Sequence, residues 1–152
     1  MNALVSYELL TAWFGSPANG ITPEGGLYGT YINNTGADSV KGMIVQISTD
    51  KDNAVEIATE DSAVPIGVIY EDGAANGSPV KVVVYGKAQV LLKNNMDSYR
   101  GYWCGISDTQ GRMIQSTAGP ETLVELKRQI GHSLESKAGS TDILALVQLN
   151  FI

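Results

Sequence analysis

One phrase occurs twice in this chain, and the repetition constrains the fold more than any other feature of the sequence. The two segments are IGVIYEDGAANGSPVKVVVYG, which begins at Ile66, and IGHSLESKAGSTDILALVQLN, which begins at Ile130. Each opens with Ile-Gly, carries a glutamate four residues after the glycine, passes through a loop of small residues to Gly-Ser, and ends in an apolar stretch. Two copies are too few for a solenoid, so the repetition predicts two similar halves of one fold.

Further matches place the two halves at about residues 42–92 and 101–152. Gly42 and Gly101 each precede an Ile-Ser pair by five residues. The spacing between matched glycines drifts as loop insertions and deletions would produce, being 59 residues for Gly42 and Gly101, 64 for Gly67 and Gly131, and 62 for Gly77 and Gly139. The alternative is that two sheets of one sandwich need similar turns.

Short apolar segments predict strands along most of the chain. They are rich in Val, Ile and Tyr, alternate in polarity, and are bounded by Gly, Pro, Asn or Asp. The predicted strands lie within 42–48, 53–59, 65–71, 79–86, 88–92, 102–107, 112–116, 130–136 and 142–152. The segment GPETLVELKRQ at 119–129 fits either a strand or a short helix that opens at Thr117 or Pro120. We therefore expect an all-β protein, a small sandwich or barrel, with at most one short helix.

The first forty residues differ from the rest. An apolar, aromatic-rich opening is followed by a stretch dense in Gly, Pro and Asn, and ITPEGGLYGTY is too glycine-rich to predict a strong strand. We therefore divide the chain into an N-terminal extension or arm at 1–40 and a β-domain at 41–152. An arm would bind a partner through its large side chains, which are Leu4, Tyr7, Leu10, Trp13 and Phe14. The alternative is a first strand that packs into the domain's own core.

Charge and composition exclude several classes of partner. The 152 residues include 16 acidic and 10 basic side chains, a net charge of −6. The lysines and arginines are spread singly, so no basic stripe is available to displace counterions from phosphates, and we expect no nucleic-acid partner. No run approaches the ~20 apolar residues of a membrane span, so we expect no membrane partner. The single Cys104 rules out an intrachain disulfide framework, as suits synthesis in a reducing cytoplasm.

The sequence offers little chemistry for catalysis or for metal binding. His132 and Cys104 could together form a thiol nucleophile and its base, but His132 takes the place of Val68 in the other half, which favours a packing role. Glu71 and Glu135 recur at matched positions, which favours a structural role such as accepting backbone N–H groups. The segment DKDN at 50–53 begins like a calcium loop but lacks the third ligand and the turn glycine. We expect no enzyme, no cofactor and no metal site.

Residues 40 to 150 resemble the capsid decoration, or cement, proteins of tailed bacteriophages. In that family a strand reading roughly G-[IV]-x-x-E leads into an Ala/Gly-rich loop and then V-x-V-x-x-x-G. The matching residues here are Gly67, Val68, Glu71, Ala74, Ala75, Gly77, Val80, Val82 and Gly86. The resemblance implies a non-catalytic virion protein, made in the host cytoplasm, that binds the major capsid protein on the capsid exterior, typically as a homotrimer. The lambda-type members are shorter, and the first forty residues lie outside the resemblance.

A module of a phage fibre, spike or tail is the alternative function. Such a module would bind a surface or a glycan. Aromatic side chains can stack on sugar rings or pack in a core. The candidates are Tyr28, Tyr31, Tyr99, Tyr102 and Trp103.

Overall fold

The computed structural model describes residues 19–62 and 64–151, and it confirms the all-β prediction. Strands make up 45% of the described residues and helix 5%. The strands join in one sheet that closes into a β-barrel with extra strands. Within the described residues, no helix is long and apolar enough to cross a membrane.

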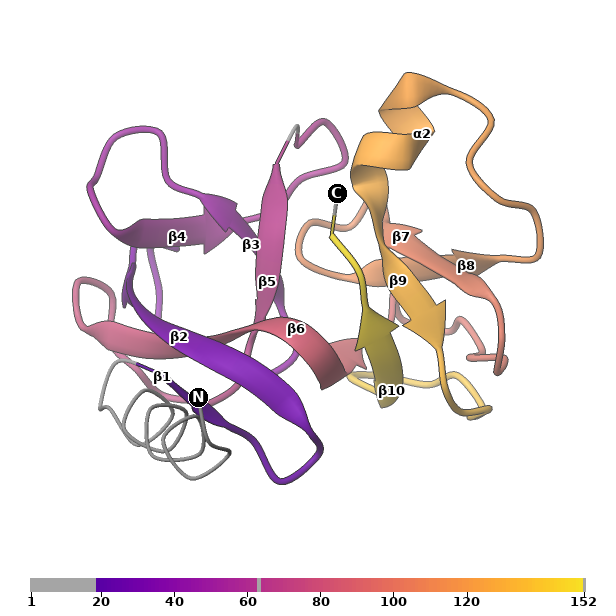
Figure 1. Ribbon diagram of the computed structural model, residues 1–152, viewed down its shortest axis with the longest axis horizontal. Helices are drawn as coiled ribbons and strands as arrows, with labels where there is room; N and C mark the ends of the chain where they lie inside the picture. Colours follow the sequence, from indigo (N-terminus) through magenta and orange to yellow (C-terminus); the bar gives the residue numbers. More distant parts are fainter. Residues whose placement is uncertain (1–18, 63, 152) are drawn as a thin grey trace, which may run out of the picture.

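Five strands close the first ring, which occupies one side of the molecule in Figure 1. These are β2 (Gly26–Asn33), β3 (Ile44–Ile47), β4 (Ala54–Ile57), β5 (Pro65–Ile69) and β6 (Pro79–Leu91). Around the ring, β2 pairs with β4, β4 with β3, β3 with β5, β5 with β6, and β6 again with β2. A short strand β1 (Asn19–Ile21) pairs with β2 outside the ring.

The second ring repeats this order with β6 in a new role. Its own strands are β7 (Trp103–Ile106), β8 (Met113–Ser116), β9 (Gln129–Ser133) and β10 (Leu144–Leu149). They are paired β8–β7–β9–β10, which matches β4–β3–β5–β6. In the first ring, β2 pairs with the first half of β6. In the second ring, the second half of β6 takes the place of β2 and pairs with β10, and a parallel bridge from Leu92 to Met113 takes the position of the β2–β4 pairing. The predicted two halves are therefore two rings, and they share one strand.

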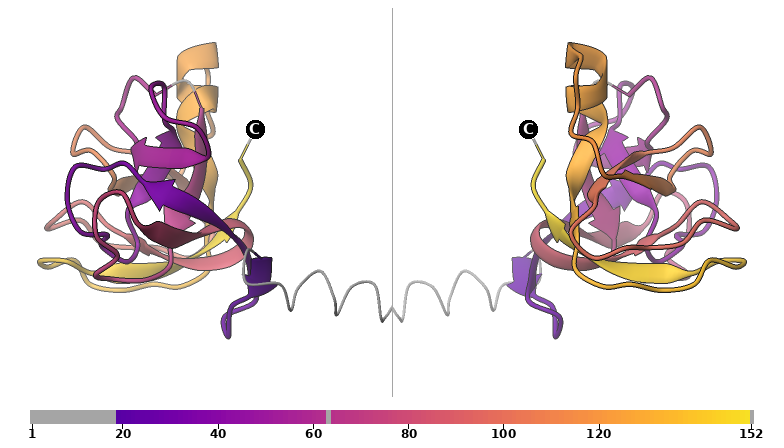
Figure 2. Two further views of the ribbon diagram at one scale, coloured as in Figure 1. Left: turned by 90° about the vertical axis from the view of Figure 1, so that its left-hand side faces the viewer. Right: turned by 90° about the vertical axis from the view of Figure 1, so that its right-hand side faces the viewer.

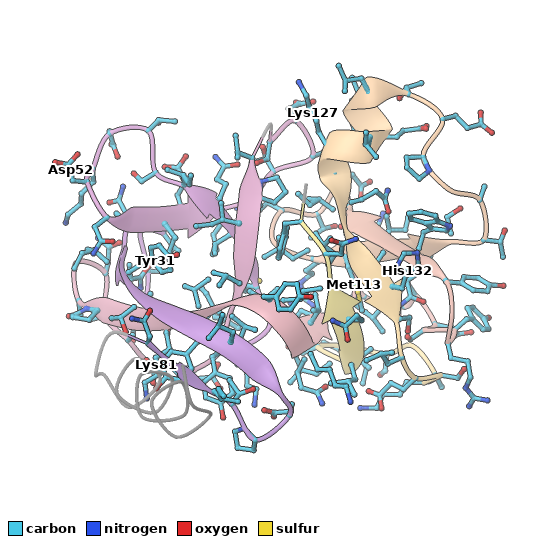
Figure 3. The ribbon with its side chains drawn as sticks, in the orientation of Figure 1. Tyr31, Asp52, Lys81, Met113, Lys127 and His132 are labelled. Carbon is cyan, nitrogen blue, oxygen red and sulfur yellow. The ribbon has the colours of Figure 1, made fainter. Side chains whose placement is uncertain are left out.

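Strand β6 runs unbroken for 13 residues across the molecule, where the sequence predicted two strands at 79–86 and 88–92. At Gly86 the pairing of β6 changes from the first ring to the second, since Gly86 is the partner of Gly26 in β2 and of Leu149 in β10. One hydrophobic cluster contains buried residues of both rings, among them Val68 and Ile130. A second cluster holds Val45, Val55, Ile69, Val80 and Val82 of the first ring, with Tyr31 packed against it (Figure 3). The rings therefore pack together as one body.

The strand register confirms the predicted alignment of the two halves. Val68 is the partner of Ile44, and His132 is the partner of Trp103, so His132 holds the place of Val68. Both pairings shift register one residue later, after Val45 in the first ring and after Cys104 in the second. The same irregularity at the same position indicates one local geometry built twice.

The predicted boundary at residue 40 does not match the structure. Residues 19–33 form β1 and β2, and β2 closes the first ring, so this part of the proposed extension belongs to the β-domain. The sequence of β2 is glycine-rich because its neighbours approach closely: a Cβ atom at Gly26 would lie 2.5 Å from the carbonyl oxygen of Lys87. Leu4, Tyr7, Leu10, Trp13 and Phe14 lie outside the described residues.

The ambiguous segment is a helix, α2 (Leu123–Arg128). It begins after Thr122, later than the predicted Thr117 or Pro120. The Thr122 hydroxyl accepts the Glu125 N–H, and the Glu125 carboxylate accepts the Thr122 N–H, a capping box that fixes the helix start. The helix stands above the strands of the second ring (Figures 1 and 2) and buries none of its residues.

Candidate functional site

A pocket of about 400 Å³ lies between strands β7 and β8 and the segment that leads through α2 to β9. We call it the α2 pocket. Its wall is part apolar and part polar, as in sites that bind small molecules. The lining residues are Trp103, Gly105, Ile106, Ile114, Gln115, Ser116, Ala118, Gly119, Pro120, Glu121, Glu125, Arg128 and Gln129.

Trp103 forms a fixed wall of the α2 pocket. Its ring centroid lies 4.3 Å from that of His132, which is on the neighbouring strand β9 (Figure 3). On another side, the backbone at Gly119 packs so closely that a Cβ atom there would lie 3.2 Å from Cε2 and Cζ2 of the indole. Trp103 is therefore held in place from two sides.

Gln129 presents its amide nitrogen to the same pocket, because a Cβ atom at Gly105 would lie 3.2 Å from Nε2. Its Nε2 donates to the carbonyl oxygen of Glu125 at 3.3 Å. Its Oε1 is buried and has no hydrogen-bond partner among the described residues. The amide nitrogen carries two N–H groups, so one of them remains for a ligand, whereas the buried Oε1 is closed to one.

Arg128 lines the pocket and ties α2 to the first ring. Its Nε donates to the carbonyl oxygen of Glu60 at 2.7 Å, and its terminal nitrogens lie 3.2 Å from the Glu60 carboxylate and 3.9 Å from that of Asp61. The Arg128 charge is thus already matched by acidic groups of the first ring. The remaining charges at the pocket are the carboxylates of Glu121 and Glu125.

The α2 pocket is built where the second ring departs from the first. Gly105 stands where the first ring has Gln46, whose Nε2 donates to Glu56 at 2.7 Å across β3 and β4. The connection before β9 spans residues 117–128 and includes α2, whereas the matching connection before β5 spans only 58–64. The absent side chain and the longer connection together leave the space.

The structure does not bring Cys104 and His132 together as a catalytic pair. Successive residues of a strand point to opposite faces, and Cys104 is buried in the core while His132 contacts Trp103. Burial raises the pKa of the Cys104 thiol to about 12, although a hydrogen bond with Gln115 opposes the shift. The thiol is therefore protonated at neutral pH.

The two matched glutamates have the predicted structural role. The Glu71 carboxylate accepts the Lys81 N–H at 3.2 Å, and the Glu135 carboxylate accepts the Leu146 N–H at 2.8 Å. Each carboxylate thus anchors the loop between two adjacent strands of its ring. This interpretation from the repeat is confirmed.

The calcium-like segment at 50–53 is a polar turn. Asp50 Oδ1 accepts from Asn34 Nδ2 at 2.8 Å and from the Ser48 hydroxyl at 2.9 Å. Within residues 19–62 and 64–151, no three side chains of His, Cys, Asp or Glu are grouped so that they could hold a metal ion.

The aromatic residues proposed for glycan stacking do not form one site. Tyr28 stacks on Tyr70 at 6.3 Å in the first ring, where Tyr31 packs against the core. Tyr99 and Tyr102 contact each other at 4.9 Å in the second ring. Trp103 alone of the five lines the α2 pocket.

Sequence reasoning missed the polar part of the pocket. Gln129 and Gly105 belong to no recognisable sequence motif. Only a comparison with the first ring, where Pro65 and Gln46 hold the matching places, distinguishes them. The chain matches no known protein family, and no curated protein is significantly similar to it in sequence. The resemblance to capsid decoration proteins therefore remains a prediction.

Proposed function

We propose that the protein decorates and stabilises the capsid of a tailed bacteriophage by binding the outer face of the major capsid protein lattice. The observation that carries the proposal is the joining of two rings by one strand. Domains connected by a linker move relative to one another, whereas β6 is hydrogen-bonded in both rings and a shared core cluster packs across them. A protein that braces a junction between capsid subunits needs this kind of rigid span.

Two surface properties support the same role. The net charge of −6 suits an exterior coat, which should not bind the packaged DNA. Leu123 and Val124 on α2 are 66% and 56% exposed, and the helix buries no residue within its own chain. These two apolar side chains are therefore available for contact with a protein partner.

The copy number of the chain in purified phage particles tests the proposal. Hundreds of copies per particle, counted by mass spectrometry against the major capsid protein, are expected for a decoration protein. A few copies would indicate the alternative, a module of a fibre, spike or tail. Absence from the particles would refute both functions.

The N-terminal residues that the sequence predicts to bind a partner are tested in the full-length chain. Trp13→Ala combined with Phe14→Ala should weaken binding to purified shells by about tenfold or more, since a few aromatic anchors dominate most interfaces. Tyr85→Ala is the matched control, because Tyr85 is 63% exposed and lies on β6. Equal binding by the double variant and the control would remove these residues from the interface. Sedimentation of the free and shell-bound protein tests the proposed homotrimer.

A further inference from the structure

We propose that the α2 pocket binds a neutral sugar ring. The inference goes beyond the capsid role and does not depend on it, because it is argued from the chemistry of the pocket alone. It assigns the pocket to a monosaccharide or to one ring of a glycan.

The comparison of the two rings shows that the fold does not require the pocket. At the matched position the first ring has Ile44, which is fully buried, where the second has the half-buried Trp103. The first ring also closes with a shorter connection and with Gln46 in place of Gly105. A ring of the same strand order forms without these features, so folding does not require them. We infer that they serve another role.

The wall of the pocket matches the two surfaces of a sugar. The indole of Trp103, with Ile114 and Pro120, offers an apolar wall to the C–H groups of a pyranose. Gln129 Nε2 faces the space at Gly105, and the N–H group that is not used by the carbonyl oxygen of Glu125 can donate to a sugar hydroxyl. Backbone positions at Ala118 and Gly119 complete the lining.

Charge selects a neutral sugar over an acidic one. Glu121 and Glu125 both line the pocket and are exposed, so their negative charges repel a carboxylate. The Glu125 oxygen Oε2 already accepts the N–H groups of Glu121 and Thr122, so the carboxylate of Glu121 is the acceptor available to a sugar hydroxyl. Arg128, the only basic side chain in the lining, is engaged by Glu60 and Asp61. A volume of about 400 Å³ lies near the lower end of the range for ligand pockets, which suits one or two rings.

Two variants of the full-length protein test the assignment. Gly105→Gln introduces the first-ring residue and takes up part of the pocket beside Trp103 and Gln129. The backbone at Gly105 is outside the left-handed region, and the nearest atom to an added Cβ is Gln129 Nε2 at 3.2 Å. Gln129→Leu removes the amide donor at similar size. Gln46→Leu is the matched control, because Gln46 Oε1 is also buried without a partner among the described residues but lies outside the lining of the α2 pocket.

Binding is measured by saturation-transfer NMR with glucose, galactose, mannose, N-acetylglucosamine and N-acetylneuraminic acid as probes. At least one of the four neutral sugars should receive saturation from the wild-type protein, and the acidic sugar should not. Gly105→Gln and Gln129→Leu should each weaken that binding by about tenfold, as expected for loss of shape or of one good hydrogen bond. Gln46→Leu should bind as the wild type does. Far-UV circular dichroism checks that each variant is folded. If Gln129→Leu is not folded, Gly105→Gln alone is sufficient to test the proposal.

Several results would overturn the proposal. They are the absence of signal from all four neutral sugars, a signal from the acidic sugar only, and undiminished binding by Gly105→Gln. If sugars do not bind and Gly105→Gln instead abolishes self-association in sedimentation, the pocket holds a second copy of the chain. The copy number in particles is measured separately, so failure of the sugar site and failure of the capsid role are distinguishable.

Discussion

Gly131→Ala should cost the protein a large part of its stability, because two independent penalties meet at this residue. A Cβ atom at Gly131 would collide with the carbonyl oxygen of Gln148, a backbone atom of the adjacent strand β10 that cannot rotate away. The backbone φ of 150° is also one that side chains rarely adopt. The collision and the strained backbone explain why the repeated phrase keeps glycine after isoleucine in the second ring.

Two other glycines separate these penalties. Gly67, the counterpart of Gly131, has no left-handed φ, but its added Cβ would lie 2.6 Å from the carbonyl oxygen of Val83. Gly101 has a φ of 85° and no atom within 4 Å of an added Cβ. We expect a loss of about 1–3 kcal/mol for Gly67→Ala from overpacking and about 1–2 kcal/mol for Gly101→Ala from strain. Gly131→Ala combines both and should cost roughly 2–5 kcal/mol, against a total of about 5–15 kcal/mol for a typical domain.

Urea unfolding followed by circular dichroism measures the three losses. The free energy of unfolding is extrapolated to water, and an unchanged m-value shows that the variants unfold as the wild type does. Gly131→Ala should lie near the sum of the other two losses. A loss at Gly131 no larger than that at Gly101 would refute the close strand approach on which the reasoning rests.

Three further predictions concern single side chains. Burial raises the pKa of Cys104 from 9.0 to about 12, so the unfolded chain releases the thiol proton at a lower pH than the folded chain does. The free energy of unfolding therefore falls by up to about 1.4 kcal/mol per pH unit as pH rises from 9 towards 12. In urea titrations Cys104→Ala should lose this part of the alkaline slope, and equal slopes in the variant and the wild type would contradict the burial. Glu135→Leu leaves the Leu146 N–H without its acceptor, so it should cost about 1–3 kcal/mol of stability and speed hydrogen exchange at that amide. Glu135→Gln keeps an acceptor and should change the exchange rate little. Unaltered protection of the Leu146 amide in Glu135→Leu would show that the Glu135 carboxylate does not anchor the loop. Arg128→Met breaks the contact between α2 and Glu60 and should lower Tm by about 2–4 °C, and additive losses in the double variant with Glu60→Gln would show that the two side chains do not interact.

The strands and the alignment of the two halves could be predicted because both depend on local patterns. Alternating apolar residues and bounding turn residues placed β3 to β5 and β7 to β10 close to their observed positions. The Ile-Gly phrase aligned Val68 with His132, and the strand register confirms that alignment. Local patterns are reliable here because each strand is short and ends at a turn.

The shared strand could not be predicted from such patterns, because it depends on contacts between distant segments. Gly26 and Gly29 weaken the strand signal of β2, yet Gly26 is required by the close approach of Lys87 in β6. One further signal was available. Asp-Ser-x-x-Gly occurs at 38–42 and again at 97–101, which extends the repeat upstream into the segment that follows β2 in one copy and β6 in the other.

The α2 pocket was beyond the sequence for a different reason. Trp103 was noticed as an aromatic residue, but aromatic residues usually pack in cores. Its role as a wall depends on the absence of a side chain at Gly105 and on the path of residues 117–128. An absent side chain and a loop path leave no periodic pattern to detect.

The shared strand also determines how the protein bears load. In antiparallel pairs the hydrogen bonds run perpendicular to the strands, and β6 is antiparallel to β2 in one ring and to β10 in the other. A force that pulls the rings apart along β6 therefore stretches each row of bonds in shear, so that many bonds must yield together. A force across the strand would instead peel the bonds one at a time. We therefore expect the molecule to resist force best along the line that joins its rings.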